Sequence, residues 1–301
     1  MQPLITTVLD LDHALGGEVG LLIGGGLGLY LKQEHLRRTG ERTLVPLALL
    51  PTARTTEDID LFLRAEVIAS TAAVARLRAA LDGLGFRAVP GSEWLRFTRE
   101  VGGRRVLLDL MVGPLREHSN AVCLRNLRAR PKGLRGKLGV HAFATEAALG
   151  IESEPMRIPL DGVRSSGLHS RCEVLIPRAF PYVLMKLGAM RDRIGDQSKQ
   201  EGRHHAIDLY RIVGLLTEEE VEVSERLARE HAGHAEIGSA MRTVDLLLAP
   251  SDGIGRVRLL EHQRMHRASM PAVDPDLLVR ELRRLLVPPP VDSAPAWLGS
   301  R

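Results

Sequence analysis

Three aspartates in apolar surroundings are the residues of this chain best placed to do chemistry. Asp58 and Asp60 lie two residues apart in TEDIDLFL, and Asp109 lies within RRVLLDLMVG. A strand sends residues i and i+2 to the same face, so a strand over 57–63 would hold two carboxylates side by side. An ionised carboxylate is strongly disfavoured in a core unless a positive charge compensates it. Because Mg²⁺ prefers carboxylate oxygens, we expect these aspartates to hold two Mg²⁺ ions.

Three consecutive glycines, Gly24, Gly25 and Gly26, end the apolar run VGLLIGGG. This pattern predicts a strand over 19–26 that closes in a tight turn, and the apolar spacing over 27–38 predicts a helix directly after it. Bare backbone N–H groups at the N-terminus of a helix attract anions. If the two strands are neighbours, the glycine turn would therefore hold a phosphate beside the aspartates.

Each of these features has a simpler structural explanation when it is taken alone. An Asp-x-Asp pair often lies on the surface of an edge strand, and a glycine triplet is more often a turn than a phosphate cradle. Asp109 could pair with one of the arginines at 104–105. The ordered combination of strand, glycine turn, helix, Asp-x-Asp strand and a third acidic strand is much less expected by chance.

The elements around these residues predict an α/β protein. A helix is expected over 66–82, and from 177 onward the apolar spacing is helical. We expect a mixed β-sheet domain flanked by helices over 1–176 and a helical domain over 177–301 that ends in a loosely held Pro-rich tail. Short strands are expected at 86–90, 93–100, 104–113, 157–162 and 173–177.

The composition indicates a soluble protein with an aliphatic core, because hydrophobic residues make up 44% of the chain and aromatic residues only 3%. Cys123 and Cys172 are far apart, which fits a reducing compartment. The N-terminus lacks a basic segment and no apolar run reaches spanning length, so we expect a cytoplasmic protein without a membrane segment. Seven Lys or Arg residues stand against one acidic residue over 116–137, which permits a polyanionic partner.

The order of these motifs resembles the nucleotidyltransferase superfamily, whose signature is a strand ending in Gly-Gly or Gly-Ser, a helix, and a strand with Asp-x-Asp. The segment RTTEDIDL is also similar to the R-x-[ST]-x-D-hydrophobic-D pattern of the AbiEii-type nucleotidyltransferases. These are the toxins of type IV toxin–antitoxin and abortive-infection systems. The interval from Gly25 to Asp58 is longer than usual in the superfamily, which implies an insertion around 39–53. The residues on the positions of the pattern are Arg54, Thr56, Asp58 and Asp60.

Two downstream residues also match that family, which has a helical lysine and, about two dozen residues later, an aspartate. Lys186 in YVLMKLGAMRDR and Asp208 in HHAIDLYRIV occupy these places. Simpler explanations are again open. Lys186 could be a surface lysine whose stem lies along the helix, and Asp208 could pair with Arg211 or Arg203.

The resemblance implies a two-metal transfer of a nucleoside monophosphate from a nucleoside triphosphate (NTP) to an acceptor hydroxyl. Asp58 and Asp60 would bind Mg²⁺, and Asp109 would help to deprotonate or orient the acceptor. Lys186 would neutralise triphosphate charge, and Asp208 would position Lys186 or the nucleotide base. The residues implied to contact phosphates or nucleotide, besides Lys186, are Gly24, Gly25, Gly26, Arg54 and Thr56.

The acceptor is the least defined part of this prediction. The basic segment and the resemblance favour tRNA as the acceptor and a toxin that has a cognate antitoxin protein. A first alternative is a small-molecule acceptor, as in the antibiotic-modifying nucleotidyltransferases. A second alternative is a non-catalytic module with a degenerate nucleotidyltransferase fold that binds a nucleotide or a partner.

Overall fold

The structure is a computed structural model that describes residues 1–17, 20–51, 56–115, 118–133, 139–196, 202–266 and 272–289. The chain forms two compact units. The first comprises Met1–Lys32 and Ala53–Pro177, and the second comprises Gln33–Thr52 and Arg178–Arg301. The first unit is a mixed β-sheet with helices and the second is helical, which confirms the expected α/β class.

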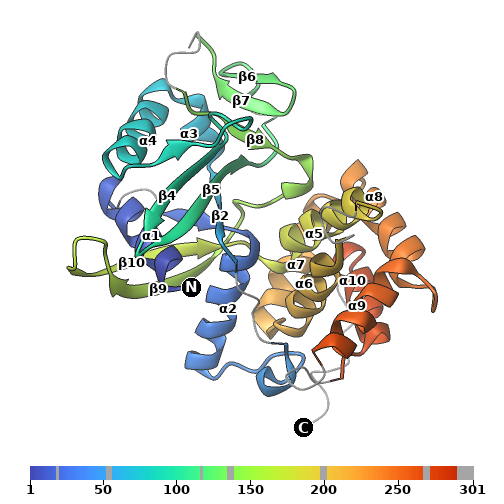
Figure 1. Cartoon of the computed structure of the whole chain (residues 1–301). Helices are drawn as coiled ribbons and strands as arrows, with labels where there is room; N and C mark the ends of the chain where they lie inside the picture. The colour runs from blue at the N-terminus through green and yellow to red at the C-terminus, as the bar shows by residue number, and fades with distance from the viewer. Residues whose placement is uncertain are drawn as a thin grey trace. The chain divides into compact units, whose positions relative to one another are not determined.

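The sheet of the first unit has ten strands among the described residues, in the order β6-β7-β8-β5-β2-β1-β10-β9, with β4 on β5 and β3 on β4 (Figure 1). β2 runs parallel to β5 and antiparallel to β1, and β1 runs parallel to β10. The strands are β1 (Leu21–Ile23), β2 (Asp58–Leu63), β3 (Arg87–Ala88), β4 (Arg96–Val101), β5 (Arg104–Val112), β6 (Val122–Arg125), β7 (Arg128–Pro131), β8 (Ala142–Ala144), β9 (Met156–Val163) and β10 (His169–Ile176).

The strand predicted over 57–63 is confirmed as β2, and its alternation separates acids from apolar residues. Ile59 and Leu61 are buried at 0% and 2% exposure, whereas Asp58 and Asp60 on the other face are half-buried. The sheet therefore has one apolar face in this region and one face that presents the carboxylates.

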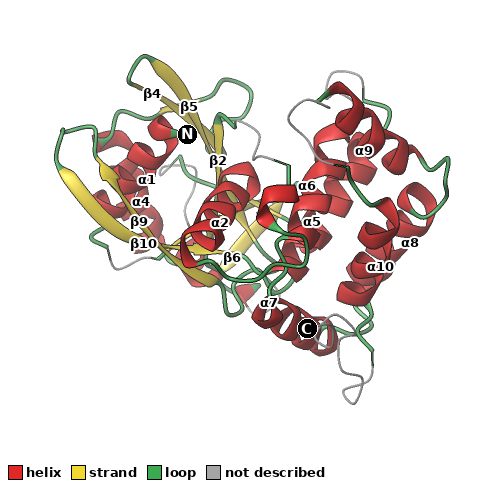
Figure 2. Cartoon of the chain, turned by 90° about the horizontal axis from the view of Figure 1, so that it is seen from below, coloured by secondary structure: helices red, strands yellow, loops and turns green. Residues whose placement is uncertain are grey.

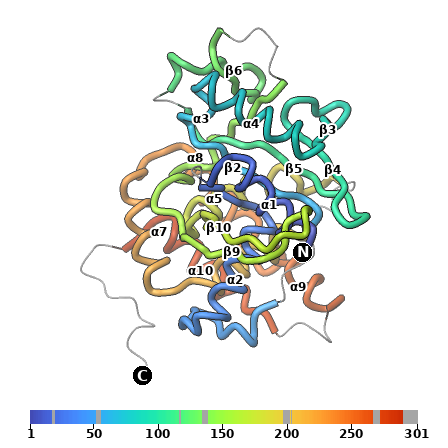
Figure 3. The backbone as a smooth tube through the Cα atoms, turned by 90° about the vertical axis from the view of Figure 1, so that its left-hand side faces the viewer, coloured from blue at the N-terminus to red at the C-terminus, as the bar shows by residue number. Residues whose placement is uncertain are grey.

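Helix α1 (Gln2–Ala14) covers the face of the sheet opposite the aspartates and packs against β9 and β10 (Figure 3). It is held there by a buried ion pair in which Arg99 Nη2 of β4 donates to Asp10 Oδ2 at 2.6 Å. Arg99 is an odd number of residues from Arg96 on β4, so the two arginines face opposite sides of the sheet. The sequence pattern did not predict α1.

Three further helices begin in the first unit: α2 (Gly25–Thr39), α3 (Ala65–Ala69) and α4 (Thr71–Gly83). The prediction of a single helix over 66–82 was wrong in one respect, because the structure has two helices there that are separated at Ser70. That residue has extended dihedral angles, and its hydroxyl accepts a hydrogen bond from the Ala73 N–H at 3.2 Å. A serine N-cap starts a new helix, which explains the break. The β6–β7 hairpin and β8 also had no counterpart in the prediction.

The described part of the second unit is made of helices (Figure 2). The acidic run TEEEVEVSE at 217–225 has a structural role, because Glu220 is fully buried and its Oε2 accepts a hydrogen bond from the Ala179 N–H at 3.0 Å. The Glu220 carboxylate thus caps the start of α5, where backbone N–H groups lack partners within the helix. The helices of this unit are α5 (Ala179–Arg193), α6 (Arg203–Gly214), α7 (Glu218–Glu230), α8 (Ala235–Thr243), α9 (Ile254–Met265) and α10 (Pro275–Leu286), with short helical turns at Leu47–Leu49 and Val244–Leu248.

None of the helices in the described ranges is long and apolar enough to cross a membrane. Cys123 and Cys172 are both free thiols.

Candidate functional site

The glycine turn lies directly against Asp60. The Gly24 N–H donates to the Asp60 backbone carbonyl at 2.8 Å, which ties the end of β1 to β2. Gly25 begins α2 with φ +60°, and a Cβ atom there would lie 1.7 Å from Asp60 Oδ2. No side chain fits in that space, so the bare backbone at the N-terminus of α2 faces the Asp60 carboxylate.

Thr56 links the same turn to Asp58. A Cβ atom on Gly26 would lie 3.3 Å from Thr56 Oγ1, so the threonine packs closely on the glycine. The Thr56 hydroxyl donates a hydrogen bond to Asp58 Oδ1. Thr56 is buried at 6% exposure, and its hydroxyl is therefore fixed between the glycine turn and the first aspartate.

Asp60, Asp109 and Arg96 form one row across three neighbouring strands. Asp60 is in register with Asp109 in the parallel pair β2–β5, and Asp109 is opposite Arg96 in the antiparallel pair β4–β5. Residues in register point to the same face, so the three charged side chains are adjacent. Arg96 forms a bidentate interaction with Asp109, in which Nε donates to Oδ1 at 2.5 Å and Nη2 donates to Oδ2 at 2.6 Å.

The partner of Asp109 is therefore Arg96 rather than an arginine at 104–105. The pKa of the Arg96 guanidinium is raised above its ordinary value, first by the hydrogen bond to Asp109 and then by the negative charges of Asp109, Asp58 and Asp60. Arg96 thus acts as the counter-cation of the acidic face, although its side chain stays 42% exposed.

Sequence reasoning missed Arg96, although a local pattern could have identified it. Gly102 and Gly103 form a two-residue turn with φ +56° and +72°, the conformation that joins antiparallel strands most tightly. Such a turn fixes Val101 opposite Arg104, and counting outward along both strands places Arg96 opposite Asp109.

The donor atoms of this face partly fit the expected metal. Among the residues that the structure describes, no group of three or more His, Cys, Asp and Glu side chains is arranged to hold a metal ion. Asp58 and Asp60 supply hard carboxylate oxygens beside the Gly25 backbone, which suits Mg²⁺ together with a phosphate. Asp109 does not fit while both of its oxygens bind Arg96. The metal-ligand roles of the three aspartates remain predictions.

Lys186 and Asp208 form a buried ion pair within the helical unit. Lys186 Nζ on α5 donates to Asp208 Oδ2 on α6 at 2.8 Å, with the two residues 9% and 0% exposed. Arg211 Nη1 also approaches Asp208 Oδ1 at 3.5 Å. The alternative that Lys186 is a surface lysine is wrong. The alternative pairing of Asp208 with Arg211 is present alongside the contact with Lys186, and the side chain of Arg203 lies outside the described part of the chain.

His205 borders this pair and is neutral. Burial first, and then the positive charges of Lys186 and Arg193, lower the pKa of His205 to about 3. Arg193 Nη1 lies 2.9 Å from His205 Nε2, so the neutral ring can accept a hydrogen bond from the guanidinium. The cations that contact the Asp208 carboxylate are thus Lys186 and Arg211, and the neutral His205 adds no charge beside them.

Some predicted features lie outside the described residues. These are Arg54, the ends of the basic segment at 116–117 and 134–137, and the Pro-rich tail from 290 onward.

Comparisons with known proteins leave the family open. No protein-family model matches the chain, and no curated protein matches its sequence. Among solved structures, the chain is similar to the antibiotic-resistance factor ANT(2'')-Ia, described in solution with substrate-regulated conformation dynamics. The identity is 15%, the match covers 88% of this chain and 100% of the other, and the TM-score is 0.29. A likeness this weak supports no conclusion about function.

Proposed function

We propose that this chain is a Mg²⁺-dependent nucleotidyltransferase that moves a nucleoside monophosphate from an NTP to an acceptor hydroxyl. The observation that carries the proposal is the contact between the bare backbone of Gly25, at the start of α2, and the carboxylate of Asp60. This contact sets an anion-attracting helix N-terminus next to metal-binding oxygens, which are the two elements that a metal-bound triphosphate requires.

Each group of the site has a separate role in this reaction. The backbone N–H groups of the glycine turn bind phosphate oxygens, and Asp58 and Asp60 bind the metal. When bound, Mg²⁺ offsets phosphate charge and favours departure of pyrophosphate. The acceptor oxygen forms a bond to the α-phosphorus while the bond to pyrophosphate breaks. Asp109 receives the acceptor proton once Arg96 has released its carboxylate.

We propose tRNA as the acceptor, with this chain as a toxin that a cognate antitoxin protein restrains. The support is the β6–β7 hairpin together with the residue that follows it, which carry four basic residues within the eight positions 125–132. Arg125 and Lys132 are exposed, and Arg128 and Arg130 are half-buried. Such a surface binds a phosphate backbone without reading sequence.

One observation favours a second candidate, the non-catalytic nucleotide-binding module. Arg96 already neutralises Asp109, so the acidic face has a counter-charge without a metal ion. In that case the site would bind a nucleotide but transfer nothing.

A transfer assay separates these functions. The full chain is incubated with each NTP labelled in its α-phosphate, with Mg²⁺ and with total tRNA. We expect label in tRNA, and we expect Asp60→Asn to abolish it while Asp82→Asn, an exposed control on α4, does not. Label in an added aminoglycoside instead of tRNA would support the small-molecule alternative. NTP binding without transfer to either acceptor would overturn the catalytic proposal in favour of the non-catalytic module.

The toxin role has its own readout. Expression of the parent chain should arrest bacterial growth, and expression of Asp60→Asn at the same level should not. Equal growth of both strains would refute the toxin role and leave the transferase activity untouched.

A further inference from the structure

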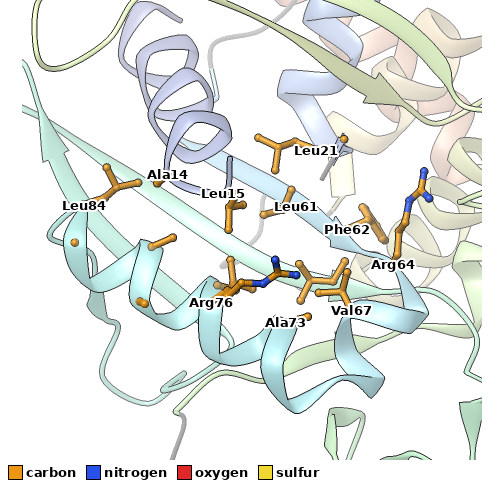
Figure 4. A pocket seen from close by; sticks show the side chains of 16 residues that line it. Ala14, Leu15, Leu21, Leu61, Phe62, Arg64, Val67, Ala73, Arg76 and Leu84 are labelled. Carbon is orange, nitrogen blue, oxygen red and sulfur yellow. The ribbon is translucent and has the colours of Figure 1, made fainter. Parts of the chain in front are cut away.

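A cavity of about 530 Å³ lies within the first unit, on the side of β2 away from the aspartates. It is enclosed by the end of α1, the start of β1, the end of β2, and helices α3 and α4 (Figure 4). Leu61 and Leu63 alternate with Asp60 along β2, so they face the opposite side of the sheet. The cavity is therefore separate from the candidate transferase site.

The walls of the cavity are predominantly apolar. Small-molecule sites typically enclose about 300–1,000 Å³ and combine apolar walls with a few polar groups, and this cavity falls within that range. The apolar side chains that line it include Leu15, Leu21, Leu61, Leu63, Val67, Leu77 and Leu84.

The rim carries positive charge and no carboxylate among the described lining residues. In Figure 4 the guanidinium of Arg76 extends from α4 toward the space beside Leu15 and Val67, whereas that of Arg64 points away from it. Arg76 is exposed, and no hydrogen bond or ion pair joins its side chain to another residue in the described ranges. A guanidinium in this state retains all its donors for a carboxylate or phosphate.

We propose that this cavity binds an amphipathic organic anion, with its apolar body against the leucine walls and its acidic head group on Arg76. Burial of the apolar body supplies most of the affinity, because removal of hydrocarbon from water is roughly proportional to the area buried. The charged hydrogen bond to Arg76 supplies the preference for an anion over a neutral molecule of the same shape. This inference does not depend on nucleotide chemistry.

Isothermal titration calorimetry of the full chain tests the proposal with three probes that share a ten-carbon chain: decanoate and decyl phosphate below their micellar concentrations, and decanol below its solubility limit. We expect one molecule of at least one anion to bind per chain, about tenfold more tightly than decanol. Arg76→Gln should remove that tenfold preference. Arg87→Gln, which alters an exposed arginine of β3 away from the cavity, should leave it unchanged.

A second variant tests the location of the site. Ala80 lines the cavity from α4, so Ala80→Leu should weaken binding of the anion and of decanol alike. Circular dichroism establishes whether the Ala80→Leu protein is folded. If that protein is unfolded, the loss of anion preference in Arg76→Gln tests the location of the site instead. The proposal is overturned if none of the probes binds, if decanol binds as tightly as the anions, or if Arg87→Gln has the same effect as Arg76→Gln.

Discussion

Replacement of Asp208 by asparagine should strongly destabilise the helical unit. The Asp208 carboxylate is fully buried and accepts a hydrogen bond from Lys186 Nζ at 2.8 Å, with Arg211 at 3.5 Å. Asparagine keeps the size of the side chain but removes its charge. The Lys186 ammonium, in a residue only 9% exposed, would then remain buried without the carboxylate.

The magnitude follows from the burial of both partners. Breaking a buried ion pair by removing one member costs about 3–5 kcal/mol, because the remaining charge is left in a medium that solvates it poorly. The helical unit is a domain of ordinary size, for which 1 kcal/mol corresponds to about 2–4 °C in melting temperature. We therefore expect Asp208→Asn to lower the melting temperature by about 6–20 °C.

A double variant separates the cost of an unpaired charge from other effects of the substitution. Lys186→Met combined with Asp208→Asn removes both charges of the lysine–aspartate pair and keeps an apolar chain of similar length. It should recover part of the lost stability, because the buried Arg211 still loses the nearby carboxylate. Asp192→Asn provides the matched control, because Asp192 is exposed on the same helix as Lys186 and, within the described residues, forms its ion pair with its neighbour Arg191.

Urea unfolding followed by far-ultraviolet circular dichroism measures these differences through the midpoint and slope of the transition. Two results would refute the reasoning: Asp208→Asn unfolding at the same urea concentration as the parent, or the double variant remaining as unstable as the single one. The same proteins also test the implied role of Lys186. A stable double variant that no longer transfers nucleotide would show that the Lys186–Asp208 pair contributes more than stability.

Three further predictions concern the acidic face and the buried histidine. Arg96→Gln removes the cation that holds Asp109, so calorimetric titration should show Mg²⁺ binding about tenfold more tightly, and unchanged affinity would contradict this role. Gly25→Ala places a Cβ atom 1.7 Å from a carboxylate oxygen and should lower both NTP binding and melting temperature. Gly16→Ala, at φ +82° in open space, is the control for backbone strain alone, about 1–2 kcal/mol, and an equal effect of both variants would rule out the steric clash. The pKa of His205 is lowered from 6.5 to about 3, so the unfolded chain binds a proton as pH falls below 6.5 while the folded chain does not. As the pH is lowered from 6.5 toward 3, the free energy of unfolding should therefore fall by up to about 1.4 kcal/mol per pH unit. His205→Gln should flatten this part of the profile in urea titrations at stepped pH, and an unchanged slope would show that other groups cause it.

Features that depend on local periodicity and local turn chemistry can be predicted from the order of the amino acids. The strand with Asp58 and Asp60 was predictable because alternation along a strand assigns each residue to a face without reference to the rest of the fold. The glycine turn was predictable because three glycines after an apolar run interrupt a strand. Even the pairing of Arg96 with Asp109 was encoded locally, in the Gly-Gly turn between their strands.

Contacts between residues that are distant in sequence depend on how the elements pack. Nothing in the local pattern indicates that Glu220 caps a helix that begins about forty residues earlier, or that Asp10 of α1 pairs with Arg99 of β4. These contacts depend on how elements pack, and packing is set by the fit of whole apolar faces rather than by neighbours in sequence. For the same reason the acidic character of 217–225 was visible in the sequence, whereas the burial of one of its carboxylates was not.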